Sequence, residues 1–182
     1  MSGVTWMLVL VRLAGEPSRY RVAVWRELRR VGAVPVTQGA WLMPVTPFFA
    51  AAERKVRELA ERGSGEVITV EVTDKEGVAD ASALAAAFAA ARIAEWAEFS
   101  ADCDKFEAEI AKEIRIEKFT LAELDEEEQS LDRLRRWYRE LKLRDVQNLP
   151  DGAAAEQRLK ECTEAFDDYA DQVYRAMHDR VD

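Results

Sequence analysis

The spacing of hydrophobic residues in the first part of the chain alternates between that of strands and that of helices. Residues 6–13 (WMLVLVRL) form an almost continuous apolar run, which predicts a buried strand. In residues 19–31, Val24, Leu28 and Val31 recur at spacings of four and three residues. These three side chains therefore share one face of a predicted helix.

A hairpin, a second helix and a further strand follow. Residues 33–37 and 40–45 are short apolar runs separated by a Gln-Gly pair, which is compatible with a tight turn. Thr46 followed by proline predicts the start of a second helix, and residues 66–73 (EVITVEVT) alternate as a half-exposed strand does. The order β-α-β-β-α-β predicts a ferredoxin-like unit over residues 1–76.

After a polar stretch at residues 74–77 (DKEG), hydrophobic residues recur only at helical spacing. A Thr-Leu-Ala-Glu capping box at residues 120–123 begins one helix, and a loop over residues 146–152 precedes the last. The last helix has a heptad seam of Ala155, Leu159, Cys162, Phe166, Tyr169, Val173 and Ala176. Such seams predict an antiparallel helical bundle over residues 80–182, so the predicted fold class of the chain is α+β.

Composition is typical of soluble globular proteins and narrows the chemistry. The 182 residues are 48% hydrophobic and 34% charged, which is enough apolar material for a core. No apolar run approaches the roughly 20 residues of a membrane span. The N-terminus lacks a signal-peptide pattern, so we predict a cytoplasmic protein without membrane contact.

Two cysteines and one histidine are too few for a disulfide framework, a zinc site or a histidine-based catalytic triad. The glycines are scattered rather than gathered in a phosphate-binding loop. We therefore expect no enzymatic activity, no metal site and no cofactor.

Charge is distributed unevenly along the chain. Residues 1–63 contain ten Lys/Arg and five Asp/Glu, whereas residues 64–182 contain sixteen and thirty. The first region thus has a formal charge of +5 and the second of −14. This asymmetry predicts two regions with different electrostatic roles.

Several stretches carry a resemblance to a known family. The basic helix (VWRELRRVGA), the hairpin (GAWLMP), FSADCDKFEAEI, KFTLAELDEEEQSLDRLRRWY, an RD pair and a last helix with LKEC together resemble the N-terminal domain of the chromate-resistance regulator ChrB. The resemblance extends over residues 6–173. Residues 1–75 are more loosely similar to the ferredoxin-like domain of PaaX-type repressors and to small CRISPR-associated nucleases. The resemblance implies a cytoplasmic regulator of a chromate-efflux operon that responds to chromate and binds its promoter.

Arginine provides the candidate anion-binding residues. The candidates are Arg12 at the end of the first strand and Arg19, Arg26 and Arg30, which lie about opposite the apolar face of the first helix. Clustered guanidinium groups suit chromate, a tetrahedral dianion, and they also suit the phosphates of promoter DNA. A solvated helix face, with arginines paired to acidic residues, is the alternative interpretation.

The hairpin offers a candidate partner surface. Trp41 alternates with Leu42, so one of the two faces the core and the other faces outward. An exposed tryptophan there would suit a partner or a contact between subunits, whereas helices on both sides would bury it. Because ferredoxin-like units of the resembled families often pair through their sheets, we expect a homodimer.

Cys103 and Cys162 occupy seam positions of their helices. If the three helices run up, down and up, the two thiols lie at similar height in one core layer. They are either small apolar core residues or a redox pair that senses an oxidant such as chromate. The acidic run at residues 125–128 suits the first turns of a helix better than a metal site.

Two function classes remain. The first is a ChrB-type regulator of chromate resistance that binds promoter DNA, chromate or a similar oxyanion through its basic N-terminal region. The alternative is a non-enzymatic adaptor that binds a partner protein through its acidic helical bundle. A small nuclease is excluded, because such enzymes hold a metal with an acidic residue near the end of the first strand, and residues 11–13 read Val-Arg-Leu.

Overall fold

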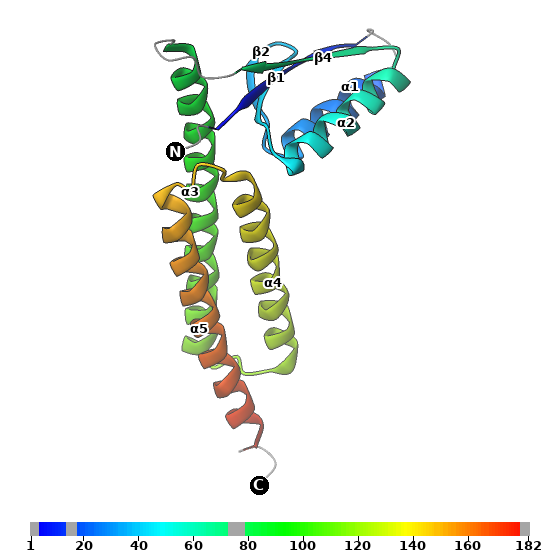
Figure 1. Ribbon diagram of the computed structural model, residues 1–182. Helices are drawn as coiled ribbons and strands as arrows, with labels where there is room; N and C mark the ends of the chain where they lie inside the picture. Colours follow the sequence, from blue (N-terminus) through cyan, green and yellow to red (C-terminus); the bar gives the residue numbers. More distant parts are fainter. Residues whose placement is uncertain (1–3, 14–17, 73–78, 179–182) are drawn as a thin grey trace. The chain divides into compact units, whose positions relative to one another are not determined.

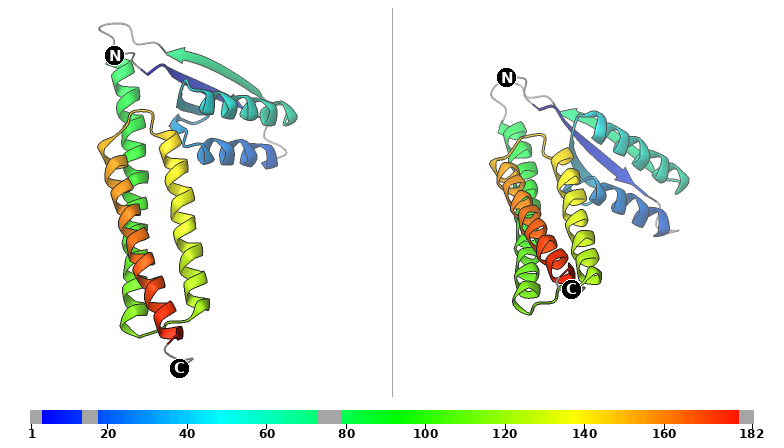
Figure 2. Two further views of the ribbon diagram at one scale, coloured as in Figure 1. Left: turned by 60° about the horizontal axis from the view of Figure 1, so that its bottom comes forward. Right: turned by 90° about the horizontal axis from the view of Figure 1, so that it is seen from below.

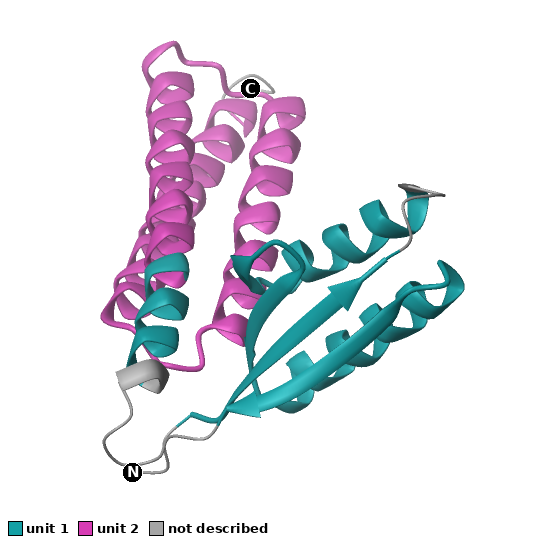
Figure 3. Cartoon of the chain, turned by 90° about the horizontal axis from the view of Figure 1, so that it is seen from above, with its two compact units in different colours: residues 1–91 teal, residues 92–182 magenta. Residues whose placement is uncertain are grey.

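The protein has the predicted α+β class, with one four-stranded antiparallel sheet and five helices in the described part of the chain (Figure 1). The computed structural model describes residues 4–13, 18–72 and 79–178. The chain divides into two compact units, residues 1–91 and 92–182 (Figure 3). Each unit has its own core and is described by itself.

The first unit contains a sheet with two helices on one face, together with the start of the following helix up to residue 91 (Figure 3). Its elements are β1 (Trp6–Arg12), α1 (Ser18–Arg30), β2 (Val34–Thr37), β3 (Ala40–Pro44), α2 (Pro47–Arg62) and β4 (Glu66–Val72). The strand order in the sheet is β2-β3-β1-β4, and every neighbouring pair is antiparallel. Because β1 lies between β3 and β4, the first strand of the chain is central to the sheet.

Two predicted helix caps are present. The side-chain oxygen of Thr46 accepts a hydrogen bond from the amide of Phe49 at 3.4 Å, and Pro47 is the first residue of α2. Thr120 likewise accepts from the amide of Glu123 at 3.3 Å. Each hydroxyl satisfies one of the amides that a helix leaves without a partner at its N-terminus.

The turn between β2 and β3 depends on Gly39. Its φ is +80°, a conformation that glycine adopts readily and other residues rarely adopt. Its carbonyl oxygen accepts a hydrogen bond from the amide of Val11 at 2.7 Å. A Cβ at Gly39 would lie 2.9 Å from the carbonyl oxygen of Val11. The turn is therefore held directly against the end of β1.

The first core extends beyond the predicted domain boundary. Phe88, in the first turns of the helix that follows β4, packs on Trp6 with 5.1 Å between ring centroids and on Phe49 with 6.0 Å. All three side chains are almost fully buried. These contacts explain why the first unit continues to residue 91. The boundary predicted at residues 74–77 lies outside the described residues.

Three long helices share the second core: α3 (Ala79–Arg115), whose later part belongs to this unit, α4 (Leu121–Arg144) and α5 (Pro150–His178). They lie side by side, and α4 runs opposite to α3 and α5 (Figures 1 and 2). Seam residues from all three helices form one buried cluster, including Trp96, Cys103, Leu131, Cys162 and Tyr169. None of the helices in the described residues has both the length and the apolar character needed to cross a membrane.

The start of α5 differs from the prediction. The loop predicted over residues 146–152 ends earlier, because α5 begins at Pro150. The carboxylate of Asp145 accepts a hydrogen bond from the amide of Leu149 at 3.1 Å and from the indole of Trp96 at 3.3 Å. Gly152 is buried in the first turn of α5, where a Cβ would lie 3.3 Å from the Trp96 ring. The glycine thus marks close packing rather than a loop.

Candidate anion-binding surface of the first unit

Helix α1 carries the main concentration of positive charge in the first unit. Its 13 residues include five arginines and one glutamate. Val24 and Leu28 hold the helix to the core, and all five arginines are exposed. The helix therefore presents cations to solvent along the surface that does not face the sheet.

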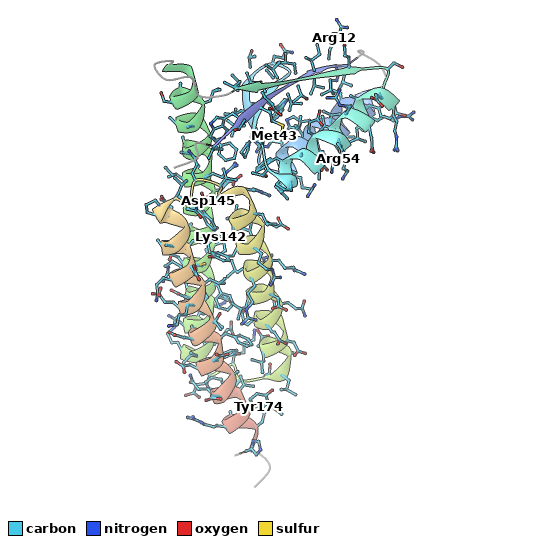
Figure 4. All side chains as sticks on the ribbon, viewed as in Figure 1. Arg12, Met43, Arg54, Lys142, Asp145 and Tyr174 are labelled. Atoms are coloured by element: carbon cyan, nitrogen blue, oxygen red, sulfur yellow. The ribbon has the colours of Figure 1, made fainter. Side chains whose placement is uncertain are left out.

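Arg12 is separate from the α1 arginines. It extends from the sheet face opposite to the two helices (Figure 4), in keeping with the alternation of side chains along β1. Its guanidinium forms an exposed ion pair with Glu66 of β4 at 2.6 Å. The structure thus does not bring the four predicted arginines together as one cluster.

Arg30 has a structural contact. Its Nη2 and Nε atoms donate to the carboxylate of Glu27 at 2.5 and 3.1 Å, and Lys55 Nζ lies 2.9 Å from the same carboxylate. Glu27 is only 6% exposed. The hydrogen bonds from Arg30 lower the pKa of the Glu27 carboxyl, although burial opposes this effect. Arg30 therefore helps to stabilise a buried carboxylate.

Arg19 and Arg26 are the more available cations of the predicted set. Arg19 stacks on Tyr20, with its guanidinium carbon 4.8 Å from the ring centroid and Nη2 3.3 Å from the hydroxyl. Arg26 is exposed and has no ion-pair partner among the described residues. Both guanidinium groups can turn toward an external anion without leaving a buried carboxylate unpaired.

The structure adds a groove that the sequence interpretation missed. We call it the Trp groove; its volume is about 570 Å³. It is lined by Val11, Leu13, Arg21, Val24, Trp25, Leu28, Arg29, Pro35, Thr37, Gln38, Gly39 and Trp41. In the described part of the chain, the lining contains two indole rings, two arginines and no acidic residue. Arg21, Trp25 and Arg29 are four residues apart, a helical spacing that was visible in the sequence.

Within the Trp groove, the guanidinium carbon of Arg29 lies 5.8 Å from the ring centroid of Trp25, which is 52% exposed. Trp41 is half-buried and pairs with Pro35 across the β2–β3 ladder. The predicted partner surface at Trp41 is thus one wall of a groove that α1 also lines. Whether a partner binds there is still a prediction.

The structure places the two cysteines together. Cys103 and Cys162 are free thiols, fully buried between α3 and α5. The Sγ atom of Cys162 lies 3.7 Å from the carbonyl oxygen of Cys103 and 3.8 Å from Glu107 Oε1. The hydrogen bond with Cys103, together with burial, raises the pKa of the Cys162 thiol. Such a thiol is a poor nucleophile at neutral pH, and its redox role stays a prediction.

The acidic run at residues 125–128 contributes one buried side chain, Glu127, to a groove of about 460 Å³ between α3 and α4. Burial raises the pKa of Glu127, and the nearby carboxylates Glu109 and Glu126 raise it further. Within the described ranges, no three His, Cys, Asp or Glu side chains converge as ligands of a metal ion.

Comparison with known proteins identifies one family. The family described as "Protein ChrB, N-terminal" matches residues 21–180, which extend from within α1 to the end of α5 and so take in parts of both compact units. Strand β1 lies before the matched region, although the sheet is built around it. No curated protein matches the chain.

Proposed function

The chain belongs to the family of ChrB N-terminal domains, and from this premise we propose that it regulates chromate resistance by binding promoter DNA or chromate at the α1 surface. The family is related to regulation and resistance rather than to a known class of enzymes. The proposal places the protein in the cytoplasm, where promoter DNA is accessible.

The observation that carries the proposal is the charge of α1. This helix carries five exposed arginines and a single glutamate, which is buried, while the second unit holds 15 Lys/Arg and 25 Asp/Glu. An acidic unit repels DNA, so a DNA contact is favoured only on the first unit. Guanidinium groups donate paired N–H groups to phosphate or chromate oxygens.

Two finer assignments belong to the same proposal. The element order β-α-β-β-α-β and the strand order β2-β3-β1-β4 support a ferredoxin-like first unit. The opposite direction of α4 supports an antiparallel bundle as the second unit.

The sheet face opposite to α1 and α2 supports the expected homodimer. Leu10, Ile68 and Val70 are 38–51% exposed on this face, and exposed apolar side chains on neighbouring strands favour association. Light scattering should report a dimer for the natural chain and a monomer for Ile68→Asp. A natural chain that is monomeric at all concentrations would contradict the dimer.

The main test measures binding of DNA from the promoter of the protein's own gene by fluorescence anisotropy at several salt concentrations. The double variant Arg19→Gln, Arg26→Gln should bind more weakly. Loss of two phosphate contacts should make the negative slope of log affinity against log salt shallower, reducing its magnitude by about 1.8. The matched control is Arg136→Gln, Arg139→Gln, which removes two exposed arginines from the acidic unit.

If the double variant and the control both bind promoter DNA as the natural chain does, the assignment of α1 is wrong. Chromate is tested separately by titration calorimetry, with sulfate as a competitor of the same shape and charge. Heat of chromate binding that Arg19→Gln, Arg26→Gln abolishes would favour the oxyanion over DNA as the ligand of this surface.

The adaptor function is the alternative. It is favoured by exposed apolar residues on the acidic unit, of which Leu121 is 46% and Leu143 is 58% exposed. A partner protein that binds residues on this unit, together with an absence of promoter binding, would support it. Salt-dependent promoter binding would support the regulator.

A further inference from the structure

The Trp groove has the size and concavity of a ligand site. Its volume of about 570 Å³ lies within the range of about 300–1,000 Å³ that small-molecule sites occupy. Its walls come from three segments of the first unit: the α1 face with Trp25, the end of β1, and the hairpin with Trp41. The turn at Gly39 is bonded to Val11, so two of these walls are tied together by the backbone.

The charge of the Trp groove specifies an anion. Among the described residues, its lining includes Arg21 and Arg29 and no acidic side chain, although the whole chain has a formal charge of −9. Arg29 lies against the ring of Trp25 rather than against a carboxylate. A cation on an aromatic face keeps its N–H groups available for an anionic ligand.

The shape and polarity of the lining specify a flat group on the same ligand. Trp25 is 52% exposed, and Trp41 of the hairpin contributes a second indole to the lining. Thr37 and Gln38 stand at the exposed rim. The glutamine amide can both donate and accept, as the edge of a nucleobase requires.

We propose that the Trp groove binds a nucleotide unit, with the base stacked on Trp25 and the phosphate held by Arg21 and Arg29. This inference rests on the proposed function, because it adds recognition of an unpaired base, on the α1 face with the Trp groove, to anion binding by Arg19 and Arg26 of the same helix. Aromatic residues flanked by cations are the combination that single-stranded nucleic acids require. The same chemistry is offered by a free nucleotide and by an unpaired nucleotide within a strand.

The test uses the full chain with four probes: AMP, a short single-stranded oligodeoxyadenylate, the promoter duplex and a glutamate-rich peptide. Binding of AMP is followed by titration calorimetry, which does not depend on the tryptophan that Trp25→Ala removes, and binding of the labelled DNAs by anisotropy. Trp25→Ala should weaken binding of the oligodeoxyadenylate by roughly 5- to 150-fold, which corresponds to about 1–3 kcal/mol for one stacked base. Trp25→Phe should restore most of the binding because it restores a ring.

Tyr174→Ala is the matched control, since Tyr174 is also an aromatic residue that is 52% exposed but lies on α5. It should bind like the natural chain. Circular dichroism of Trp25→Ala should match that of the natural chain, because the half-exposed indole contributes little to the core. If Trp25→Ala loses binding of both AMP and the oligonucleotide, a free nucleotide is identified as a ligand. Loss confined to the oligonucleotide identifies a strand, and both outcomes support the proposal.

Three outcomes would overturn it. The first is equal binding of the single strand by Trp25→Ala and the natural chain. The second is preference of the Trp groove for a glutamate-rich peptide over both nucleotide probes. The third is promoter duplex binding with no binding of AMP or the single strand. This third outcome would leave the proposed function standing, whereas loss of duplex binding only in Arg19→Gln, Arg26→Gln would support that function independently.

Discussion

Replacement of Arg30 by alanine should destabilise the first unit, because Glu27 is buried and depends on it. The side chain of Glu27 is 6% exposed, and Arg30 provides two of the hydrogen bonds to its carboxylate. Lys55 remains as a partner at 2.9 Å. Hydrogen bonds to a charged group each contribute about 1.5–3 kcal/mol. Since Arg30 is 58% exposed and water can replace part of its contact, we expect a loss of about 1–2 kcal/mol in total.

The same contact predicts a pH dependence with a definite sign. Arg30 lowers the pKa of Glu27 in the folded state, so its stabilisation is fully present above the ordinary glutamate pKa of about 4.3. The stabilisation is lost as the pH falls through the lowered pKa of the folded state. The difference in stability between the natural chain and Arg30→Ala should therefore be constant near neutral pH and shrink in acid.

Urea unfolding followed by tryptophan fluorescence at several pH values measures this difference. Arg26→Ala is the control, since Arg26 is an exposed arginine on the same helix without an ion-pair partner in the described residues. The reasoning is refuted if both variants unfold at the same urea concentration, or if the Arg30→Ala difference does not change with pH. The result also matters for binding experiments, because a variant that includes Arg30 would mix lost stability with lost affinity.

Three further predictions concern the second unit. Leu131→Ala should lower the free energy of unfolding by about 2–5 kcal/mol because Leu131 is fully buried, whereas Leu143→Ala, at a 58% exposed position, should change the urea midpoint little. Glu127→Gln should stabilise the protein at neutral pH, because the raised pKa of Glu127 means that ionisation of this carboxyl opposes folding above the ordinary glutamate pKa. The stabilisation should be lost in acid, where the carboxyl is protonated in the folded and the unfolded state. Urea midpoints measured at neutral and at acidic pH check this. Cys103 and Cys162 should resist iodoacetamide in the native chain and react in urea, as mass spectrometry would show; rapid native labelling would contradict their burial.

The hydrophobic pattern was sufficient to locate the elements, because burial imposes a period on each strand and helix. Thr46 and Thr120 were recognisable as caps from local chemistry alone. The Trp groove was not predictable, since helical spacing relates Trp25 to its neighbours on α1 but does not say which strand faces them. Only the packing of α1 against the hairpin brings Trp41 to the same groove.

Arg12 shows a different limit. Its alternation with the buried Val9 along β1 already implied the opposite face of the sheet. The sequence interpretation grouped it with the α1 arginines by charge and by proximity along the chain. A group of charged residues in the sequence therefore predicts a shared surface only after each residue has been assigned to a face of its strand or helix.

The packing of Phe88 has a consequence for the order in which the chain can fold during synthesis. Strand β4 completes the sheet at Val72, but the aromatic cluster with Trp6 and Phe49 needs a side chain from the next helix. A nascent chain that has emerged only as far as residue 76 would hold all four strands and an incomplete core. The first unit should become resistant to proteases only after the start of α3 has left the ribosome, well beyond the point at which its last strand is available.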